Sequence, residues 1–228
     1  MSGRPTDWMM FPFILIILFL ETSCSHSPRP TEASSPIVIS KSAGIGGNWE
    51  SLGLPSGVKA PDITLFSPEG KTFRLYDELQ QGKPLVIFNA SYTCDVSRHN
   101  LPKMNSIMRQ FDNKARFFVV YTIEPHPADT ISPYADSLWI PDNNIKDIVT
   151  ADQPKTYGER VALAKLWRDR YHLGSEIVVD SPDNDYWQTF GQAPNMVYVI
   201  NPEGTVFYKQ SWFREKELEA ELNHIATE

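Results

Sequence analysis

Two continuous apolar runs with an amphipathic segment between them constrain the fold of this chain most. The runs are Pro84–Ala90 (PLVIFNA) and Arg116–Ile123 (RFFVVYTI), and between them Cys94–Phe111 carries apolar residues at helical spacing. Short apolar runs with turn-forming or polar flanks are typical of buried central strands. The three segments therefore predict a strand–helix–strand unit at the centre of an α/β domain.

Further elements are expected on both sides of this unit. The pattern predicts a hairpin before it and alternating helices and strands after it: Ile63–Phe66 and Thr72–Leu75 (hairpin), Tyr157–Leu173 (helix), Glu176–Asp180 (strand), Asp185–Phe190 (helix), Met196–Ile200 and Thr205–Lys209 (hairpin) and Arg214–Ile225 (helix). This order predicts a three-layer α/β sandwich with a mixed central sheet over residues 57–228.

The N-terminal part has the composition of a leader followed by a linker. Met9–Leu20 is an unbroken apolar run, too short to span a bilayer comfortably but suited to a signal-peptide core. Two small residues precede Cys24, as in bacterial lipoproteins. We expect residues 1–24 to direct export and Cys24 to carry a lipid that anchors the protein to a membrane. An ordinary cleaved signal or an uncleaved anchor are the alternatives. Residues 25–56, rich in Ser, Pro, Gly and Thr, are expected to form a flexible linker.

Charge and cysteine content exclude several classes of function. The net charge is −7 without a run of basic residues, so nucleic acid is not an expected partner. The chain has two cysteines, Cys24 and Cys94, and no Cys-x-x-Cys, so we expect neither a dithiol pair nor a metal site or other bound cofactor. If Cys24 is the anchor, any reaction that oxidises Cys94 requires an external thiol reductant.

Cys94 is the strongest candidate for a catalytic residue. It lies between a buried strand and its helix, where free backbone N–H groups and the helix dipole favour a thiolate. The hydroxyl groups of Ser91 and Thr93 are placed to donate to the sulfur, and Arg98 and His99 would add positive charge one turn later. We therefore expect a depressed thiol pKa, with an inert buried cysteine as the alternative.

Glu124 and His126 follow the second apolar run and are two residues apart. On a continuing strand this spacing puts both side chains on one face, at the sheet edge where Cys94 is expected. We expect Glu124 to orient His126 and His126 to handle a proton. The alternative is a surface histidine before a turn.

The order of elements resembles the thioredoxin superfamily. Gly57–Asp62 (GVKAPD) is similar to the entry segment of its peroxiredoxin-type and thiol-oxidoreductase members. Pro194, two residues before a predicted strand, falls where that fold places a cis-proline facing the active cysteine. The resemblance implies a cis bond before Pro194 and a contact of Pro194 with the substrate.

Within that superfamily, Pro84–Tyr208 resembles the iodothyronine deiodinases. Ser91–Cys94 (SYTC) aligns with their Ser-x-Thr-selenocysteine site, which places Cys94 at the selenocysteine position. Val119–Asp129 (VVYTIEPHPAD) is similar to their strand that ends in Glu-Ala-His-Pro-Ser-Asp, and Val178–Asn184 also matches. The resemblance implies reductive dehalogenation of an iodinated or otherwise halogenated aromatic molecule, with an external thiol as reductant and Ser91 and Thr93 near the substrate.

Four positions depart from the family pattern. Cys94 replaces selenocysteine, and Tyr92 stands where the family has a partner cysteine. Pro154 falls at the place of a histidine that contacts the hormone, and Met196 at the place of an arginine of the hormone clamp. These departures leave open whether thyroid hormone is bound.

Two other functions remain open from the sequence. A one-cysteine thiol peroxidase would use the thiolate to attack the O–O bond of a peroxide, but Ile87 and Ser91 occupy the Pro and Thr positions of the peroxiredoxin motif. A tethered, non-catalytic thioredoxin-like binding module is the third reading. A thiol pKa near the unperturbed ~8.5 favours the binding module, and a depressed pKa favours catalysis.

Overall fold

A computed structural model describes residues 28–33, 39–44 and 46–225. The predicted leader, with the apolar run Met9–Leu20 and the lipidation candidate Cys24, lies outside the described residues. Within the described ranges, no helix has both the length and the apolar character needed to cross a membrane.

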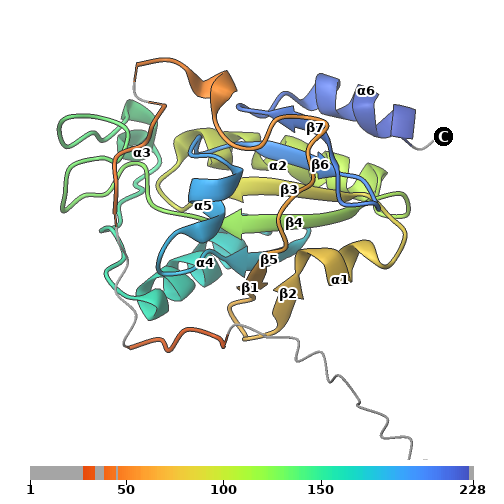
Figure 1. Cartoon of the computed structure of the whole chain (residues 1–228). Helices are drawn as coiled ribbons and strands as arrows, with labels where there is room; N and C mark the ends of the chain where they lie inside the picture. The colour runs from red at the N-terminus through yellow and green to blue at the C-terminus, as the bar shows by residue number, and fades with distance from the viewer. Residues whose placement is uncertain (1–27, 34–38, 45, 226–228) are drawn as a thin grey trace, which may run out of the picture.

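The described residues form a mixed seven-stranded sheet in the order β2-β1-β5-β4-β3-β6-β7 (Figure 1). The central strands β3, β4 and β5 are parallel. The pairs β1–β2, β1–β5, β3–β6 and β6–β7 are antiparallel. The strands have these bounds: β1 Thr64–Phe66, β2 Thr72–Arg74, β3 Leu85–Ala90, β4 Arg116–Tyr121, β5 Glu176–Val179, β6 Val197–Ile200 and β7 Val206–Gln210.

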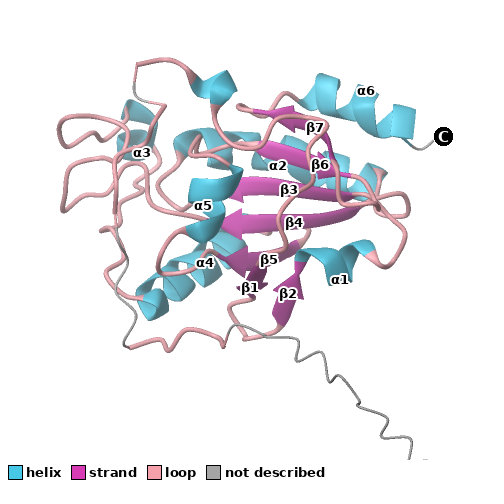
Figure 2. Cartoon of the chain, in the orientation of Figure 1, coloured by secondary structure: helices cyan, strands magenta, loops and turns pink. Residues whose placement is uncertain are grey.

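Helices cover both faces of this sheet, as Figure 2 shows. Buried side chains of α2, α4 and α6 pack on one face, and those of α1 and α5 pack on the other. The predicted three-layer α/β sandwich is therefore confirmed. The helices have these bounds: α1 Leu75–Leu79, α2 Asp95–Gln110, α3 Asp142–Lys146, α4 Tyr157–Tyr171, α5 Asp185–Phe190 and α6 Glu215–Ile225, with a 3-10 turn at Trp49–Ser51.

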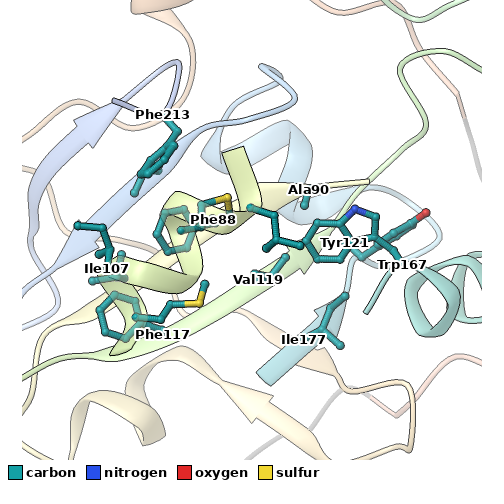
Figure 3. Close-up of a cluster of buried hydrophobic side chains, with 14 of the residues drawn as sticks. Phe88, Ala90, Ile107, Phe117, Val119, Tyr121, Trp167, Ile177 and Phe213 are labelled. Atoms are coloured by element: carbon teal, nitrogen blue, oxygen red, sulfur yellow. The ribbon is translucent and has the colours of Figure 1, made fainter. Parts of the chain in front are cut away.

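Successive side chains of a strand point to opposite faces of the sheet, so the hydrophobic core has one part on each face. On β3, Phe88 belongs to the cluster beneath α2 and α4, whereas Ile87 belongs to the cluster beneath α1 and α5. The first cluster contains Val119 of β4, Ile107 of α2 and Trp167 of α4 (Figure 3). Both β3 and β4 are thus buried on their two faces, which explains their continuous apolar sequence.

One error in the predicted element boundaries affects the candidate site. β4 ends at Tyr121 and not at Ile123. Two prolines follow within six residues, and proline cannot donate to a strand ladder. Glu124 and His126 consequently lie in the connection after the strand, not side by side on one strand face. The same connection contains α3, which the sequence analysis did not predict.

Part of the predicted flexible linker packs against the folded domain. The described residues within 41–52, which we call the strap, run from the loop after β4 to the end of β7. Ser42 donates its backbone N–H to the carbonyl of Pro133 (2.8 Å), and Ser211 donates its hydroxyl to the carbonyl of Trp49 (3.0 Å). The strap is therefore held at both ends, and its contacts with the domain correct the expectation of flexibility for these residues.

The N-terminus of α4 is stabilised by a capping box. The Thr156 hydroxyl accepts the Glu159 backbone N–H (3.2 Å), and the Glu159 carboxylate accepts the Thr156 backbone N–H (3.3 Å). We expect Thr156→Ala to lower the free energy of unfolding by about 1 kcal/mol, measured by urea denaturation. Thr150→Ala, at an exposed position outside any helix, is the control and should change it by less than ~0.5 kcal/mol. Equal effects of the two substitutions would contradict the role of the box.

Candidate functional site

Cys94 is the N-cap residue of α2. The backbone N–H of Ser97 donates to Sγ at 3.3 Å, and Sγ lies 3.9 Å from the carbonyl oxygen of Pro194. Because a carbonyl oxygen only accepts hydrogen bonds, the second contact fits a protonated thiol. Ser97 was missed from the sequence, although an N-cap side chain characteristically accepts the N–H of the third helical residue.

The predicted depression of the Cys94 pKa is wrong for this structure. Cys94 is only 1% exposed, and this burial raises the thiol pKa to about 11. The hydrogen bond from Ser97 and the charge of Arg98 lower the pKa, but the loss of hydration outweighs them. The cysteine has the predicted place at the strand–helix junction, but at neutral pH it is a thiol and not a thiolate.

Ser91 and Thr93 do not donate to the sulfur as predicted. The Thr93 hydroxyl donates to Oε2 of Glu124 at 2.7 Å and accepts the backbone N–H of His126 at 3.2 Å. The Ser91 hydroxyl is buried without a hydrogen-bond partner among the described residues. Both residues are completely buried and neither is among the residues that line the cavity described below, so their contact with substrate stays a prediction.

Glu124 holds the backbone next to Cys94 instead of orienting His126. Its carboxylate is completely buried and accepts the backbone N–H and the hydroxyl of Thr93, both at 2.7 Å, and the hydroxyl of Tyr121. Burial raises the pKa of this carboxyl group, and the three donors counteract that effect. Gln153 fixes the Glu124 backbone by pairing with both its N–H and its carbonyl, at 2.9 Å each.

His126 is held by a different set of partners. Its Nδ1 lies 3.2 Å from the carbonyl oxygen of Trp139, so Nδ1 carries the proton in the neutral ring. Nε2 lies 3.8 Å from a carboxylate oxygen of Asp95. Burial lowers the His126 pKa to about 4, although the Asp95 charge acts in the opposite direction. Asp95, not Glu124, is thus the carboxylate that faces the imidazole, and the imidazole is neutral at pH 7.

The helix α3 is fastened to the Cys94 region by two asparagine side chains. Asn143 donates to Asp95 at 2.9 Å, and Asn144 donates to the carbonyl of Thr93 at 2.9 Å. Asp95 therefore contacts both α3 and His126. These contacts join residues far apart in the sequence, which is why no local motif indicated them.

Arg98 supports this fastening and does not contact the sulfur. Its buried guanidinium donates to the carbonyl of Tyr92 (3.0 Å), to the Asn144 side chain (2.7 Å) and to Asp147 (3.3 Å). His99 is 52% exposed at its side chain and pairs with Asp147 at 3.4 Å. The Arg98 guanidinium is therefore engaged with the α3 region, and His99 lies at the surface.

Cys94 and His126 line one cavity of about 290 Å³. Aromatic rings make much of its wall, and Trp139, 45% exposed, lies at its rim. The lining residues are Trp49, Cys94, Asp95, Val96, Pro125, His126, Tyr134, Trp139, Pro141, Pro194 and Trp212. Among the described residues, no group of three or more His, Cys, Asp or Glu side chains is arranged to hold a metal ion. The cavity thus combines a thiol and an imidazole with walls suited to a flat apolar ring.

Pro194 lines the cavity, but its peptide bond is not cis as the resemblance implied. The described residues contain no cis peptide bond. A trans bond is the ordinary state before proline, and the cis expectation came from resemblance alone. Met196 is buried in the core beneath α1 and α5, and Pro154 is also buried; neither lines the cavity.

The buried carboxylate of Glu124 yields a stability prediction. In Glu124→Gln, one side-chain oxygen is replaced by an N–H₂ group that would face hydrogen-bond donors. We expect the free energy of unfolding at pH 7 to fall by about 1–3 kcal/mol in urea denaturation. Glu217→Gln is the control, since Glu217 also accepts hydrogen bonds but is half-exposed. A change at Glu124 as small as that at Glu217 would contradict the structural role of the buried carboxylate.

The structural neighbours share the fold. The chain is similar to the thioredoxin domain of a thiol-disulfide oxidoreductase from Bacteroides vulgatus, with a TM-score of 0.51 and 16% identity over 76% of this chain and 99% of that one. It is also similar to a protein of Chlorobium tepidum assigned as the thiol:disulfide interchange protein DsbE, with a TM-score of 0.53 and 17% identity over 76% and 99% of the two chains. These similarities confirm a thioredoxin-like fold.

Sequence comparisons give the family. The chain is 25% identical to the type I iodothyronine deiodinase of Xenopus laevis over 153 residues, and 28% identical to the human type II enzyme over 134 residues. These matches cover 67% and 58% of this chain, but only 55% and 46% of the relatives, so the chain spans about half of their length. The family model for iodothyronine deiodinase matches residues 53–219. The chain therefore belongs to the iodothyronine deiodinase family.

Proposed function

We propose that this protein is a thiol-dependent reductase that removes a halogen from an aromatic ring, with Cys94 as the nucleophile. The observation that carries the proposal is the shared cavity, which Cys94, His126 and several aromatic residues line together. Membership in the deiodinase family supports the reaction type. The predicted leader would place this activity outside the cytoplasm, at a membrane.

In the proposed reaction, the sulfur of Cys94 attacks the halogen atom and not the ring carbon. The S–X bond forms as the C–X bond breaks, and the electron pair of the C–X bond remains on the ring carbon, which takes up a proton. One external thiol then attacks the Cys94 sulfur, releases HX and leaves a mixed disulfide. A second external thiol releases Cys94 as a thiol. The net change converts the aromatic halide and two thiols into the dehalogenated ring, one disulfide and HX.

We assign the transfer of the proton in this reaction to His126. Because Nδ1 donates to the Trp139 carbonyl, the lone pair of Nε2 is available. Nε2 accepts the Cys94 proton as the sulfur attacks, and then delivers it to the ring carbon. Asp95, 3.8 Å from Nε2, stabilises the transient imidazolium charge. The raised thiol pKa and the lowered imidazole pKa mean that the proton moves only with attack, and no thiolate accumulates beforehand.

The titration of Cys94 provides one test. With a pKa of about 11, the thiolate fraction of the folded protein should rise about tenfold per pH unit between pH 7 and pH 10. Alkylation of Cys94 by iodoacetamide, followed by mass spectrometry of its peptide, should show the same increase. The urea-unfolded chain is the control and should level off above its unperturbed pKa, ~8.5. A midpoint at or below that value in the folded protein would contradict the raised pKa of the Cys94 thiol.

Turnover is the direct test of the proposed function. With dithiothreitol as reductant, the full chain should release iodide from 4-iodophenol, and Cys94→Ser should abolish the release. His126→Gln should lower the rate by about 10²–10⁴-fold. His99→Gln, at an exposed histidine on α2, is the matched control and should keep the parental rate.

Hydrogen peroxide is offered to the same proteins in parallel. Peroxide consumption that depends on Cys94, without iodide release, would replace the proposal with a one-cysteine thiol peroxidase. Turnover of neither compound would favour the tethered binding module. Equal rates for the His126 and His99 variants would remove His126 from the proton path.

A further inference from the structure

The wall of the Cys94 cavity carries one negative charge and no positive one. Asp95 lines the cavity, and no lysine or arginine is among the lining residues within the described part of the chain. The other two ionisable groups next to Asp95 are neutral at pH 7, because burial lowers the His126 pKa to about 4 and raises the Cys94 pKa to about 11. A ligand in this cavity therefore meets a carboxylate without a basic side chain beside it.

The Asp95 carboxylate is largely covered but only partly satisfied. Its side chain is 15% exposed, and the Asn143 side chain donates to one of its oxygens at 2.9 Å. The other oxygen lies 3.8 Å from Nε2 of His126, which carries no proton in the neutral ring. Because an ionised carboxylate can accept about four hydrogen bonds, Asp95 retains acceptor capacity at the cavity wall.

Nearby positive charge compensates Asp95 only in part. The Arg98 guanidinium donates to the Tyr92 carbonyl and to Asn144, and it pairs with Asp147 at 3.3 Å. Asp95 is the first residue of α2, whose free backbone N–H groups are equivalent to about half an elementary charge. A bound cation would complete this compensation.

The aromatic walls of the cavity also suit a positive group. Trp49, Tyr134, Trp139 and Trp212 all line it. The ring centroid of Trp49 lies 5.3 Å from that of Trp212 and 5.8 Å from that of Tyr134. The electron-rich faces of aromatic rings attract cations, tryptophan most strongly, and groups of such rings bind ammonium ions in other proteins. The carboxylate and the rings thus favour the same sign of charge.

We propose that the substrate of this cavity is a halogenated aromatic amine, whose ammonium group pairs with Asp95 while its ring lies against the aromatic walls. This inference rests on the proposed function, since it names the substrate class for the same cavity. A halogenated aromatic acid would bring a second negative charge to Asp95 and should bind poorly.

The test measures binding and not turnover. In the Cys94→Ser chain, calorimetric titration at pH 7 gives the dissociation constants of 4-iodophenethylamine, 4-iodophenethyl alcohol and 3-(4-iodophenyl)propionate. We expect the amine to bind about tenfold to hundredfold more tightly than the carboxylate, with the alcohol between them. Asp95→Asn keeps the shape of the side chain but removes its charge, and it should lower this ratio about tenfold.

Asp142→Asn is the matched control. Asp142 is exposed and does not line the cavity, and its substitution removes the same charge from the chain. Because water and salt screen an exposed charge, the ratio should change by less than about twofold. Equal effects of the two substitutions would attribute the preference to the overall negative charge of the chain and overturn the role of Asp95.

A second variant keeps the test decisive if Asp95→Asn is poorly folded. Trp139→Leu removes an aromatic face at the exposed rim but keeps an apolar side chain, so it should weaken binding of the amine about twofold to fivefold and affect the alcohol less. Equal or tighter binding of the carboxylate would overturn the inference, as would failure of all three compounds to bind, whereas iodide release from 4-iodophenol would still sustain the proposed function. A preference for the amine without iodide release by the parent chain would keep the ammonium site and remove the dehalogenation chemistry.

Discussion

The buried carboxylate of Glu124 is the interaction on which the geometry of the site depends. It receives both the backbone N–H and the hydroxyl of Thr93, the residue before Cys94, and so ties the β3–α2 connection to the chain leaving β4. Thr93 in turn accepts the backbone N–H of His126 and, through its carbonyl, the side chain of Asn144. Cys94, His126 and the helix α3 are thus positioned through one residue. An ionisable group is costly to bury without partners, and here three donors compensate for that cost.

Burial also sets the protonation states of the two groups proposed to react. The N-cap position of Cys94 and the carboxylate beside His126 would, in water, favour a thiolate and an imidazolium. The covered cavity reverses both tendencies, raising the thiol pKa to about 11 and lowering the imidazole pKa to about 4. The resting site therefore holds a neutral pair. A neutral pair needs no compensating charge within aromatic walls, and in the proposed reaction the sulfur would lose its proton only as it attacks the substrate.

The sequence was sufficient for the fold because the fold depends on local patterns. The apolar runs of β3 and β4 reflect the burial of both faces of these strands. The helical period between them reflects the burial of one side of α2. The position of Cys94 at the junction followed directly. The partners of His126 did not, because Pro125 and Pro127 end the strand on which Glu124 and His126 were expected to share a face. The direction of the thiol pKa was missed for a related reason: Cys94 is buried, and the cavity that it lines is walled by residues of the strap and of the connection after β4, which lie far from it in sequence.

A thioredoxin-like frame alone does not specify this chemistry, because the structural neighbours that share it include proteins named for disulfide exchange. Two segments are added to the thioredoxin-like fold. They are the connection after β4, which contains His126 and Trp139, and the strap, which contains Trp49. Each contributes cavity walls, and each also makes polar contacts that fix those walls: Trp139 through His126, and Trp49 through Ser211. The thioredoxin-like fold supplies the cysteine at a helix terminus, whereas the two added segments supply walls of the cavity that it lines, including the histidine proposed to move the proton. We therefore expect substrate preference in the proposed reaction to depend on the walls that the two added segments contribute.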